Sequence, residues 1–420
     1  MRVKIASALV FILSACGGAV DSDSTQRSGD ETRSGALTLP PQARVPDFVL
    51  PSIPVCPGPV ALGNARCHSH VVTDPSRKPV TNTTPRGYGP ADLQAAYQLP
   101  SSTAGSGQTI AIVDAYDDPK AESDLGVYRS YYGLPECTTA NGCFKKVNQN
   151  GVQGSYPRAN QGWALEISLD LQMASAICPN CKILLVEASS NSMADLGKAV
   201  NRAAALGANV ISNSYGASEY SSEASDEESY FDHPGVAITV SSGDSGYGVE
   251  FPAASRCVTA VGGTSLLVSY DADGTTPLSR SSETAWSGAG SGCSAYIPQP
   301  SWQTDLNLTG CSRRMVADVS AVADPNTGVA VYDSYGYQGK KGWFVVGGTS
   351  VSSPIVASVY ALAGNTGSIN YGSYPYSNYT EALYDVITGS NGDCSTYLCT
   401  AVSGYDGPTG LGTPNQTGAF

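Results

Sequence analysis

Short runs of β-branched residues alternate along this chain with longer segments of helical character, and this alternation restricts the fold more than any other feature. The runs expected to be buried strands span residues 109–113, 182–186, 209–213 and 236–241. The segments expected to be helices span residues 120–132, 163–177 and 193–206. Strands and helices in this order form right-handed β-α-β units. The sequence therefore predicts an α/β fold with a parallel sheet.

Length and charge exclude several classes of protein. With 420 residues, 41% of them hydrophobic, the chain can bury a large core, and no repeat of solenoid length is present. The net charge is −13, and basic residues form only short fragments such as Arg313–Arg314, which argues against a nucleic-acid partner. Protonating the carboxylates in acid leaves only 23 Lys and Arg, so self-repulsion at low pH should be limited. We expect a monomer.

The tripeptide Gly-Thr-Ser occurs twice, at residues 263–265 and 348–350. Only the second copy leads directly into an apolar stretch, residues 351–362, that predicts a helix. A Ser on a Gly-rich turn at the start of a buried helix suits a nucleophile, because the helix end offers free N–H groups and partial positive charge to a developing anion. Ser350 is therefore the candidate nucleophile.

Histidine is not the expected base for Ser350. The chain has three His: His68 and His70 fall in an irregular N-terminal region, and His233 precedes a proline in a turn. None has the setting of the base in a Ser-His-Asp triad. Carboxylates are the alternative.

Two carboxylates stand alone in an apolar segment, residues 163–177, which has no Gly or Pro and predicts a buried helix. Glu166 and Asp170 are its only ionisable side chains, and their spacing of four places them on one helical face. A solvated helix face is the alternative for such a pair, but apolar neighbours on that face favour a pair directed into the protein. Two carboxyls in a low-dielectric site share a proton, so one keeps a raised pKa and can accept the proton of Ser350.

A third acid, Asp244, follows the predicted strand at 236–242 in the turn Gly-Asp-Ser-Gly. In an open α/β sheet, the carboxyl edge of the strands is where ligands bind. The alternative is an Asx-turn residue that only shapes the loop.

Together, the Glu166 and Asp170 pair, the turn at Asp244 and the sequence Gly-Thr-Ser-Val-Ser-Ser-Pro at 348–354 resemble the sedolisin, or serine-carboxyl, peptidase family. The resemblance begins near residue 88, where YGPADLQAAYQL is similar to the start of a sedolisin catalytic domain, and continues to residue 412. It implies a subtilisin-like fold, which is an α/β doubly wound parallel sheet with helices on both faces.

The resemblance also implies a role for each motif residue. Ser350 would attack the peptide carbonyl, Glu166 would act as general base and acid, and Asp170 would orient and polarise Glu166. Asp244 is similar to the family's oxyanion residue, a protonated carboxylic acid that donates a hydrogen bond. We therefore expect a serine-type endopeptidase that works best in acid.

Two strand-like edges, at 212–216 and 241–243, predict how a substrate binds. An extended protein or peptide substrate should add a strand to the backbone of the enzyme. The residues expected to contact it are Ser214, Tyr215, Gly216, Ser242 and Gly243.

The C-terminal stretch is similar to the calcium site of the same family. Calcium prefers several oxygen ligands, which carboxylates and backbone carbonyls can supply. The resemblance implies carboxylates from Asp385 and Asp406 and carbonyls from Val386, Val402 and Gly404, although the family usually has Gly where this chain has Val402. A plain Gly-rich turn is the alternative.

The N-terminus has a basic start, a short apolar core at residues 5–13 and the sequence Leu-Ser-Ala-Cys ending at Cys16. That sequence is similar to the bacterial lipobox, which is cleaved before a Cys that then carries lipid, and the apolar core is too short to span a bilayer. We expect a signal peptide at 1–15 and a lipid anchor at Cys16. An ordinary secretory signal is the alternative, and either places the protein outside the cytoplasm, anchored to a bacterial membrane or secreted.

The remaining chain divides into three parts. Residues 16–54 have little to bury and predict a disordered tether, residues 55–87 form a short extension, and residues 88–420 form the peptidase domain. Sedolisins usually carry a large folded propeptide, and no full prodomain fits before residue 88. The extension is a propeptide remnant that caps the domain or a permanent part of it. A non-catalytic surface lipoprotein that binds peptides is the alternative function, but four polar groups directed into one cleft favour an enzyme.

The cysteines agree with an oxidising compartment. Besides Cys16, eleven Cys remain, and ten of them lie in close pairs: 56 with 67, 137 with 143, 178 with 181, 293 with 311 and 394 with 399. Cys257 is left over. Disulfides are favoured over a zinc site at Cys178 and Cys181, because no second pair stands at finger spacing, but the sequence alone leaves the pairing open.

Overall fold

The structure is a computed structural model that describes residues 50–58 and 60–420. The predicted signal peptide, the lipidation site at Cys16 and most of the predicted tether lie outside the described residues. Within the part that is described, no helix has both the length and the apolar character needed to cross a membrane.

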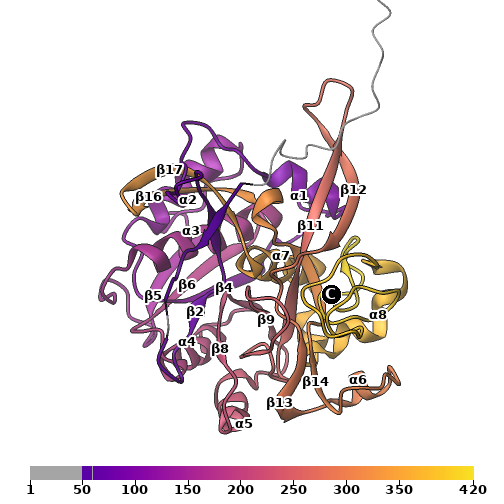
Figure 1. Cartoon of the computed structure of the whole chain (residues 1–420). Coiled ribbons are helices and arrows are strands. Elements are labelled where there is room, and N and C mark those ends of the chain that lie inside the picture. Colours follow the sequence, from indigo (N-terminus) through magenta and orange to yellow (C-terminus); the bar gives the residue numbers. More distant parts are fainter. Residues whose placement is uncertain (1–49, 59) are drawn as a thin grey trace, which may run out of the picture. The chain divides into compact units, whose positions relative to one another are not determined.

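An eight-stranded sheet forms the centre of the described chain (Figure 1). Its strands run in the order β12-β11-β9-β7-β4-β6-β5, and β15 also pairs with β11. All neighbours are parallel except β12, which is antiparallel to β11. The bounds are β4 Thr109–Ala115, β5 Phe144–Asn148, β6 Lys182–Ala188, β7 Val210–Asn213, β9 Ala237–Ser241, β11 Thr259–Tyr270, β12 Pro277–Ala285 and β15 Val319–Val322. The predicted parallel sheet is therefore confirmed.

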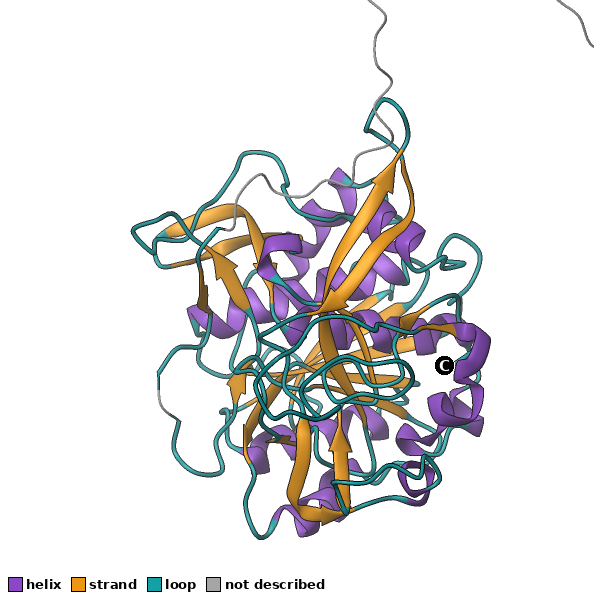
Figure 2. Cartoon of the chain, turned by 45° about the vertical axis from the view of Figure 1, so that its right-hand side comes forward, coloured by secondary structure: helices purple, strands orange, loops and turns teal. Residues whose placement is uncertain are grey.

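Helices cover the sheet. Helix α3, Gln161–Ile177, packs against α7, Thr349–Ala363, and both contact the central strands. Helix α4, Met193–Ala205, packs against β4, β6 and β7, and α2, Ala121–Tyr131, packs against α3. In Figure 1, α3 and α4 lie on opposite sides of the central strands. Figure 2 shows the same layering, with helices in purple and strands in orange. Shorter helices are α1 (Pro90–Ala96), α5 (Glu223–Asp226), α6 (Ser301–Thr304) and α8 (Tyr374–Ala382).

The four predicted helices are confirmed, and local chemistry sets their ends. Asn160 caps α3, where its side chain accepts hydrogen bonds from the backbone N–H of Gly162 and Trp163, and Ser192 caps α4 in the same way. Helix α7 ends at Gly364, which has the left-handed φ of 71° that a C-terminal glycine adopts readily.

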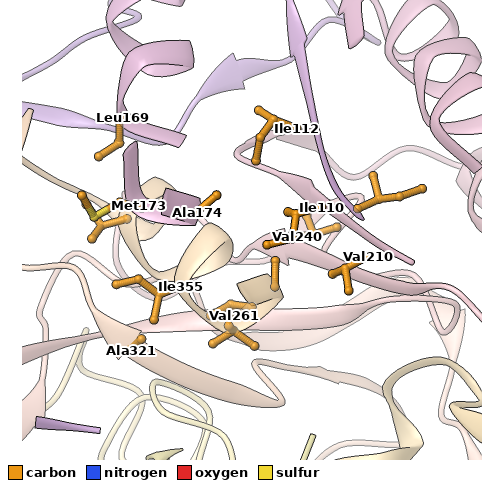
Figure 3. Close-up of a cluster of buried hydrophobic side chains, with 14 of the residues drawn as sticks. Ile110, Ile112, Leu169, Met173, Ala174, Val210, Val240, Val261, Ala321 and Ile355 are labelled. Carbon is orange, nitrogen blue, oxygen red and sulfur yellow. The ribbon is translucent and has the colours of Figure 1, made fainter. Parts of the chain in front are cut away.

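The core lies where the inner helices meet the strands, as Figure 3 shows. Aliphatic side chains from β4, β7, β9 and β11 meet side chains of α3 and α7 there, and full burial of each stabilises the fold by roughly 1.5–3 kcal/mol. The side chains in Figure 3 include Ile110, Ile112, Val210, Val240, Val261, Leu169, Met173 and Ile355. This packing fixes α3 and α7 against each other.

Helix α3 has no solvated face. Every residue from Gly162 to Ile177 is buried, including the small polar residues on the side away from Glu166. Those side chains bond within the protein: Ser168 donates to Asp118, Gln172 to the carbonyl of Tyr332, and Ser175 accepts from Arg129. An ordinary solvated helix face is thereby excluded for the carboxylate pair.

Smaller sheets surround the central one, and the N-terminal extension contributes to two of them. In one, β1 Ser52–Pro54 and β3 His70–Val72 join β17 Lys340–Gly347 and β16 Val329–Tyr337. In the other, β2 Arg66–Cys67 and β10 Glu250–Phe251 flank β8 Tyr215–Ser218. Two further pairs are β13 Gly292–Pro298 with β14 Arg313–Val316, and β18 Leu383–Tyr384 with β19 Thr413–Pro414.

The extension is thus part of the folded unit. Regular structure begins at Ser52, which differs from the expectation of a tether up to residue 54, because Ser52–Pro54 finds hydrogen-bonding partners in β3.

Five disulfides join the close pairs of cysteines. They are Cys56–Cys67, Cys137–Cys143, Cys178–Cys181, Cys293–Cys311 and Cys394–Cys399. Cys257 is a free, buried thiol. Each close pair of cysteines named from the sequence is therefore joined by a disulfide, and the pairing that the sequence left open is the one within each pair.

Candidate active site

Ser350 lies in the first turn of α7 and is buried. Its backbone N–H donates to the carbonyl oxygen of His68 at 2.8 Å, and its Oγ donates to the carbonyl of Ser214 at 3.3 Å. Because Pro354 has no N–H, the carbonyl of Ser350 loses its normal helix partner, and the hydroxyl of Ser214 donates to it at 3.4 Å. The first turn of α7 therefore directs a backbone N–H at the carbonyl of His68 and the Ser350 hydroxyl at the carbonyl of Ser214.

Glu166 is buried on α3 beside this serine. Its Oε2 accepts a hydrogen bond from the hydroxyl of Ser69, and its Oε1 has no hydrogen-bond partner among the described residues. Burial raises the pKa of Glu166 to about 8, while the hydroxyls of Ser350 and Ser69 oppose the rise because they stabilise the charged form. Glu166 is therefore a carboxyl that can both hold and accept a proton near its serine.

Asp170 and a further acid, Asp114, complete the carboxyl cluster. Burial, together with Asp114 and Glu166, raises the pKa of Asp170 well above its usual range, and burial, Glu166 and Glu187 do the same for Asp114. Repulsion leaves such a cluster with little negative charge. The serine hydroxyls favour placing that charge on Glu166, the position from which it can take the proton of Ser350.

Sequence reasoning missed Asp114. It lies near the carboxyl end of β4, directly after the apolar run Ile110–Val113, and its side chain is fully buried. The signal that could have found it is the one used for Asp244, an acid at the end of a predicted buried strand.

Asp244 follows β9 and faces the start of α7. Its Oδ1 accepts from the backbone N–H of Thr349 at 2.7 Å and from the Thr349 hydroxyl at 2.8 Å. Its Oδ2 has no hydrogen-bond partner in the described parts of the chain. Burial raises the pKa of Asp244, against the opposing effect of His70 and His68. The partners of Asp244 are 105 residues away, so its side chain reaches across the site to α7.

Gly348 leaves room for the carbonyl of His68 and the side chain of Asp244 at the start of α7. Its φ is 102°, and a Cβ there would stand 2.2 Å from the carbonyl oxygen of His68 and 2.5 Å from Asp244 Oδ2. Only glycine fits. The carbonyl oxygen and the unpartnered carboxyl oxygen thus share the space beside the N–H of Ser350.

The residues predicted to bind substrate divide into two groups. Ser214 accepts from the N–H of His68 at 3.2 Å, and Tyr215 and Gly216 pair in β8 with β2 of the extension. Ser242 and Gly243 instead lie against Gly290, whose N–H donates to the carbonyl of Gly243 at 2.8 Å.

Two histidines near Ser350, His68 and His70, were not predicted as site residues. The imidazole of His68 is buried, with Nδ1 2.8 Å from Ser241 Oγ and Nε2 2.9 Å from Glu250 Oε2. His70 Nε2 is 3.8 Å from Asp244 Oδ2. The segment expected to be irregular is thus ordered by strand pairing, and a weak signal was present in the run of apolar residues that closes it at Val71 and Val72.

The predicted calcium ligands meet in one loop region. Asp385 Oδ2 accepts from the N–H of Gly404 at 2.9 Å, and Asp406 Oδ2 accepts from the N–H of Val402 at 3.1 Å. Burial raises the pKa of Asp406 to about 7, and Asp385 contributes to the rise. Asp385 Oδ1 is buried without a hydrogen-bond partner in the described chain. Two mutually repelling carboxylates with a free oxygen fit a cation, although nowhere in the described residues do three or more His, Cys, Asp or Glu side chains form a metal-binding group.

Comparison with known proteins gives a consistent result. The model of the Subtilase family matches residues 152–373, a little over half of the chain. Kumamolisin of Bacillus sp. (strain MN-32) is 30% identical over 372 residues, covering 79% of this chain and 63% of that protein. Sedolisin of Pseudomonas sp. (strain 101) is 28% identical over 372 residues, covering 79% and 60%. This chain therefore spans less than two thirds of the length of these relatives.

Among solved structures, Pseudomonas sedolisin, a serine-carboxyl proteinase complexed with two molecules of pseudo-iodotyrostatin, is similar to this chain. The TM-score is 0.64 at 26% identity, and the match covers 79% of this chain and 96% of that one. The expected subtilisin-like α/β fold is confirmed.

Proposed function

Because the chain belongs to the subtilase family, we propose that it is a serine-carboxyl peptidase that hydrolyses peptide bonds in acid, with Ser350 as the nucleophile. One observation carries the proposal: the N–H of Ser350 donates to a peptide carbonyl oxygen of an extended segment, in the space that this oxygen shares with Asp244 Oδ2. This is the arrangement that acyl transfer requires.

The reaction follows from these positions. Ser350 Oγ attacks the carbonyl carbon while Glu166 takes the hydroxyl proton, with Asp170 and Asp114 holding protons so that the charge remains available to Glu166. The oxyanion receives the N–H of Ser350 and a hydrogen bond from Asp244 Oδ2. Glu166 then gives the proton to the departing amine, and water hydrolyses the acyl-enzyme by the same route.

Acid dependence follows from Asp244. Ionised, this carboxyl would repel the oxyanion; protonated, it donates to it. Its raised pKa extends the protonated form towards neutral pH, and activity falls as the pH rises through that pKa.

The pH-rate profile on an unfolded protein substrate tests the proposal. We expect cleavage in acid that declines towards neutral pH and is absent in Ser350→Ala. A chain that binds peptides with equal affinity before and after that substitution, and never cleaves them, would instead be the peptide-binding lipoprotein considered above.

We also propose that calcium binds Asp385 and Asp406, with carbonyls of Val386, Val402 and Gly404. When bound, the ion would neutralise the two carboxylates and stabilise the C-terminal loops. A chelator should lower the melting temperature, and calcium should restore it. An unchanged melting curve, or the same chelator effect in Asp385→Asn, argues against the site.

We propose further that the protein is exported and carries lipid on Cys16, and that it acts as a monomer. Growth with a labelled fatty acid should label the wild-type protein and not Cys16→Ser. Equal labelling of both proteins would remove the anchor from this account.

A further inference from the structure

The turn that carries Asp244 spans residues 243–248 and belongs to no helix or named strand. Two of its residues, Gly243 and Gly246, have left-handed φ values of 122° and 74°, which glycine adopts without strain. In the described chain, none of the backbone N–H groups of the turn donates to a carbonyl within the turn itself. The shape of the turn, and with it the position of Asp244, therefore depends on the segments packed against it.

One of these segments is residues 288–291, which follow β12. The N–H of Gly290 donates to the carbonyl of Gly243 at 2.8 Å, and two further bonds, of 2.9 Å and 2.8 Å, run from N–H groups of the turn to carbonyls of this segment. The two backbones are in close contact, since a Cβ on Gly290 would stand 2.1 Å from the carbonyl oxygen of Ser242. A movement of residues 288–291 would therefore move the turn.

The side chain of Asn391 holds this segment. It is buried, and its Nδ2 donates to the carbonyl of Ala289 at 2.5 Å and to the hydroxyl of Ser291 at 2.7 Å. The Ser291 hydroxyl itself donates to the carbonyl of Leu398 at 2.6 Å, so it must accept from Asn391, and the orientation of the amide is fixed. The backbone carbonyl of Asn391 also accepts from the N–H of Tyr247, which lies in the turn, at 2.8 Å.

A disulfide-closed loop supports Asn391 in turn. The N–H of Asn391 donates to the carbonyl of Cys399 at 3.0 Å, and Cys399 closes the loop through its disulfide with Cys394. The Oδ1 of Asn391 is buried and has no hydrogen-bond partner in the described chain, which costs free energy. An apolar side chain would fill this space without that cost, so the amide is explained by the groups that its Nδ2 holds.

Resting on the proposed function, we propose that Asn391 is a positioning residue for the oxyanion acid Asp244. Its action is indirect: the amide holds residues 288–291, these residues hold the turn, and the turn keeps the Asp244 carboxyl beside the N–H of Ser350. An oxyanion donor is effective only when it already lies where the charge develops, and a displacement of about 1 Å costs roughly a hundredfold in rate. Loss of the amide should therefore slow the reaction through Asp244.

The first test compares Asn391→Ala with Asn365→Ala in the full chain. Asn365 is a matched control, because its Nδ2 also donates, to the Tyr374 hydroxyl at 2.9 Å, and its Oδ1 is also buried without a partner among the described residues. It follows α7 at the end opposite to Ser350. With an unfolded protein as substrate in acid, Asn391→Ala should lower kcat per folded molecule by at least roughly tenfold and change KM less, because the oxyanion forms only in the transition state. Asn365→Ala should keep both wild-type values.

A double-mutant cycle tests whether this effect depends on Asp244. In an Asp244→Ala background the donor is already absent, so adding Asn391→Ala should lower kcat by less than about twofold further. A residue that only stabilises the fold would give the same factor in both backgrounds. Equal factors would therefore overturn the positioning role.

Hydrogen exchange followed by mass spectrometry measures the same link without turnover. Peptides that cover residues 243–248 should exchange faster in Asn391→Ala than in wild type, and at the wild-type rate in Asn365→Ala. Ser291→Ala removes one of the two acceptors of the amide and should lower kcat by roughly three- to fivefold, so it decides the question if Asn391→Ala does not fold. Wild-type exchange and wild-type kcat in the folded variants would contradict the inference.

The outcomes separate this inference from the proposed function. If wild type cleaves the substrate and Asn391→Ala cleaves it equally well, Asn391 has no positioning role and the peptidase proposal stands. If wild type cleaves nothing in acid, the proposed function is wrong, and the inference that rests on it is wrong as well.

Discussion

The two copies of Gly-Thr-Ser occupy opposite kinds of structure. Gly263–Ser265 lies within β11, whereas Gly348 precedes α7 and Thr349 and Ser350 begin it. In the strand, the backbone groups pair with β12 on one side and β15 on the other. At the start of a helix, the first N–H groups have no partner within the helix, and that of Ser350 is directed at a peptide carbonyl.

The hydroxyls differ in the same way. In the first copy, Thr264 donates to Glu283 at 2.6 Å and Ser265 donates to Asp324 at 2.6 Å. In the second, the Thr349 hydroxyl donates to Asp244 at 2.8 Å, and the Ser350 hydroxyl makes a long hydrogen bond to the carbonyl of Ser214 and lies beside Glu166. The hydroxyl of Ser350 is therefore held by a longer hydrogen bond than the hydroxyl of Ser265, at 3.3 Å against 2.6 Å.

The nucleophiles give the largest expected difference. Ser350→Ala should reduce turnover of an unfolded protein by roughly a millionfold, because no other hydroxyl replaces Oγ. Ser265→Ala should cost about 1 kcal/mol of stability through its lost hydrogen bond and leave turnover within about twofold. Turnover assays and melting curves on both variants test this prediction. If Ser265→Ala lost turnover and Ser350→Ala kept it, the nucleophile would be the serine in β11.

The next largest difference is expected between Glu166, which lies beside Ser350, and Glu283, which bonds Thr264 in the first copy. Glu166→Gln should lower activity by roughly ten-thousandfold at every pH, because an amide cannot accept the serine proton. Glu283→Gln removes the partner of Arg280 and should cost about 3–5 kcal/mol of stability, with turnover per folded molecule retained. Appreciable turnover in Glu166→Gln would mean that another group is the base.

A smaller difference, in the pH dependence of the rate, is expected between Asp244, which bonds Thr349, and Asp324, which bonds Ser265. Asp244→Asn should lose roughly ten- to a thousandfold in rate and flatten the alkaline limb of the pH profile, because an amide donates a weaker hydrogen bond at any pH. Asp324→Asn, next to Ser265, should leave the profile unchanged. A wild-type enzyme fully active at neutral pH, together with an unaltered Asp244→Asn profile, would rule out the serine-carboxyl mechanism.

The smallest effect is on stability. Burial raises the pKa values of the three clustered carboxyls, Glu166, Asp170 and Asp114, so folding favours a cluster that keeps most of its protons. The contribution of the cluster to stability is fully present below the ordinary carboxyl pKa values and is lost as the pH rises through the raised pKa values of the folded state. The melting temperature of wild type should therefore fall more steeply over this range than that of Glu166→Gln. Parallel curves would show that Glu166 does not titrate in this way.

The central sheet and its helices could be predicted because each is coded locally. Buried strands such as β4 and β6 contain short runs of mostly apolar residues, and α3 from Trp163 onwards is a long apolar segment without Gly or Pro. The pair Glu166 and Asp170 was found for the same reason, since its setting is visible within one helix.

The structure of residues 66–72, from β2 to β3, could not be predicted, because it depends on partners that are distant in sequence. The contacts of His68 with Ser241 and Glu250 span 173 and 182 residues of sequence. Strands β2 and β3 are only two and three residues long, which is too short to show the alternation of apolar and polar residues that identifies a strand in a sequence. Asp114 was missed for a different reason: it lies within β4, whereas Asp244 lies in a turn after its strand, where a polar residue is more conspicuous in the sequence.

Helix α3 carries two of the three predicted catalytic acids, and its residues from Gly162 to Ile177 are all buried. A segment with no solvent-facing surface cannot open by itself, because opening it disrupts α7 and the sheet as well. Its amide hydrogens should therefore exchange with solvent only when the whole domain unfolds. On heating, Glu166 and Asp170 should therefore keep their geometry until the domain melts, and any activity that depends on them should be lost together with the fold.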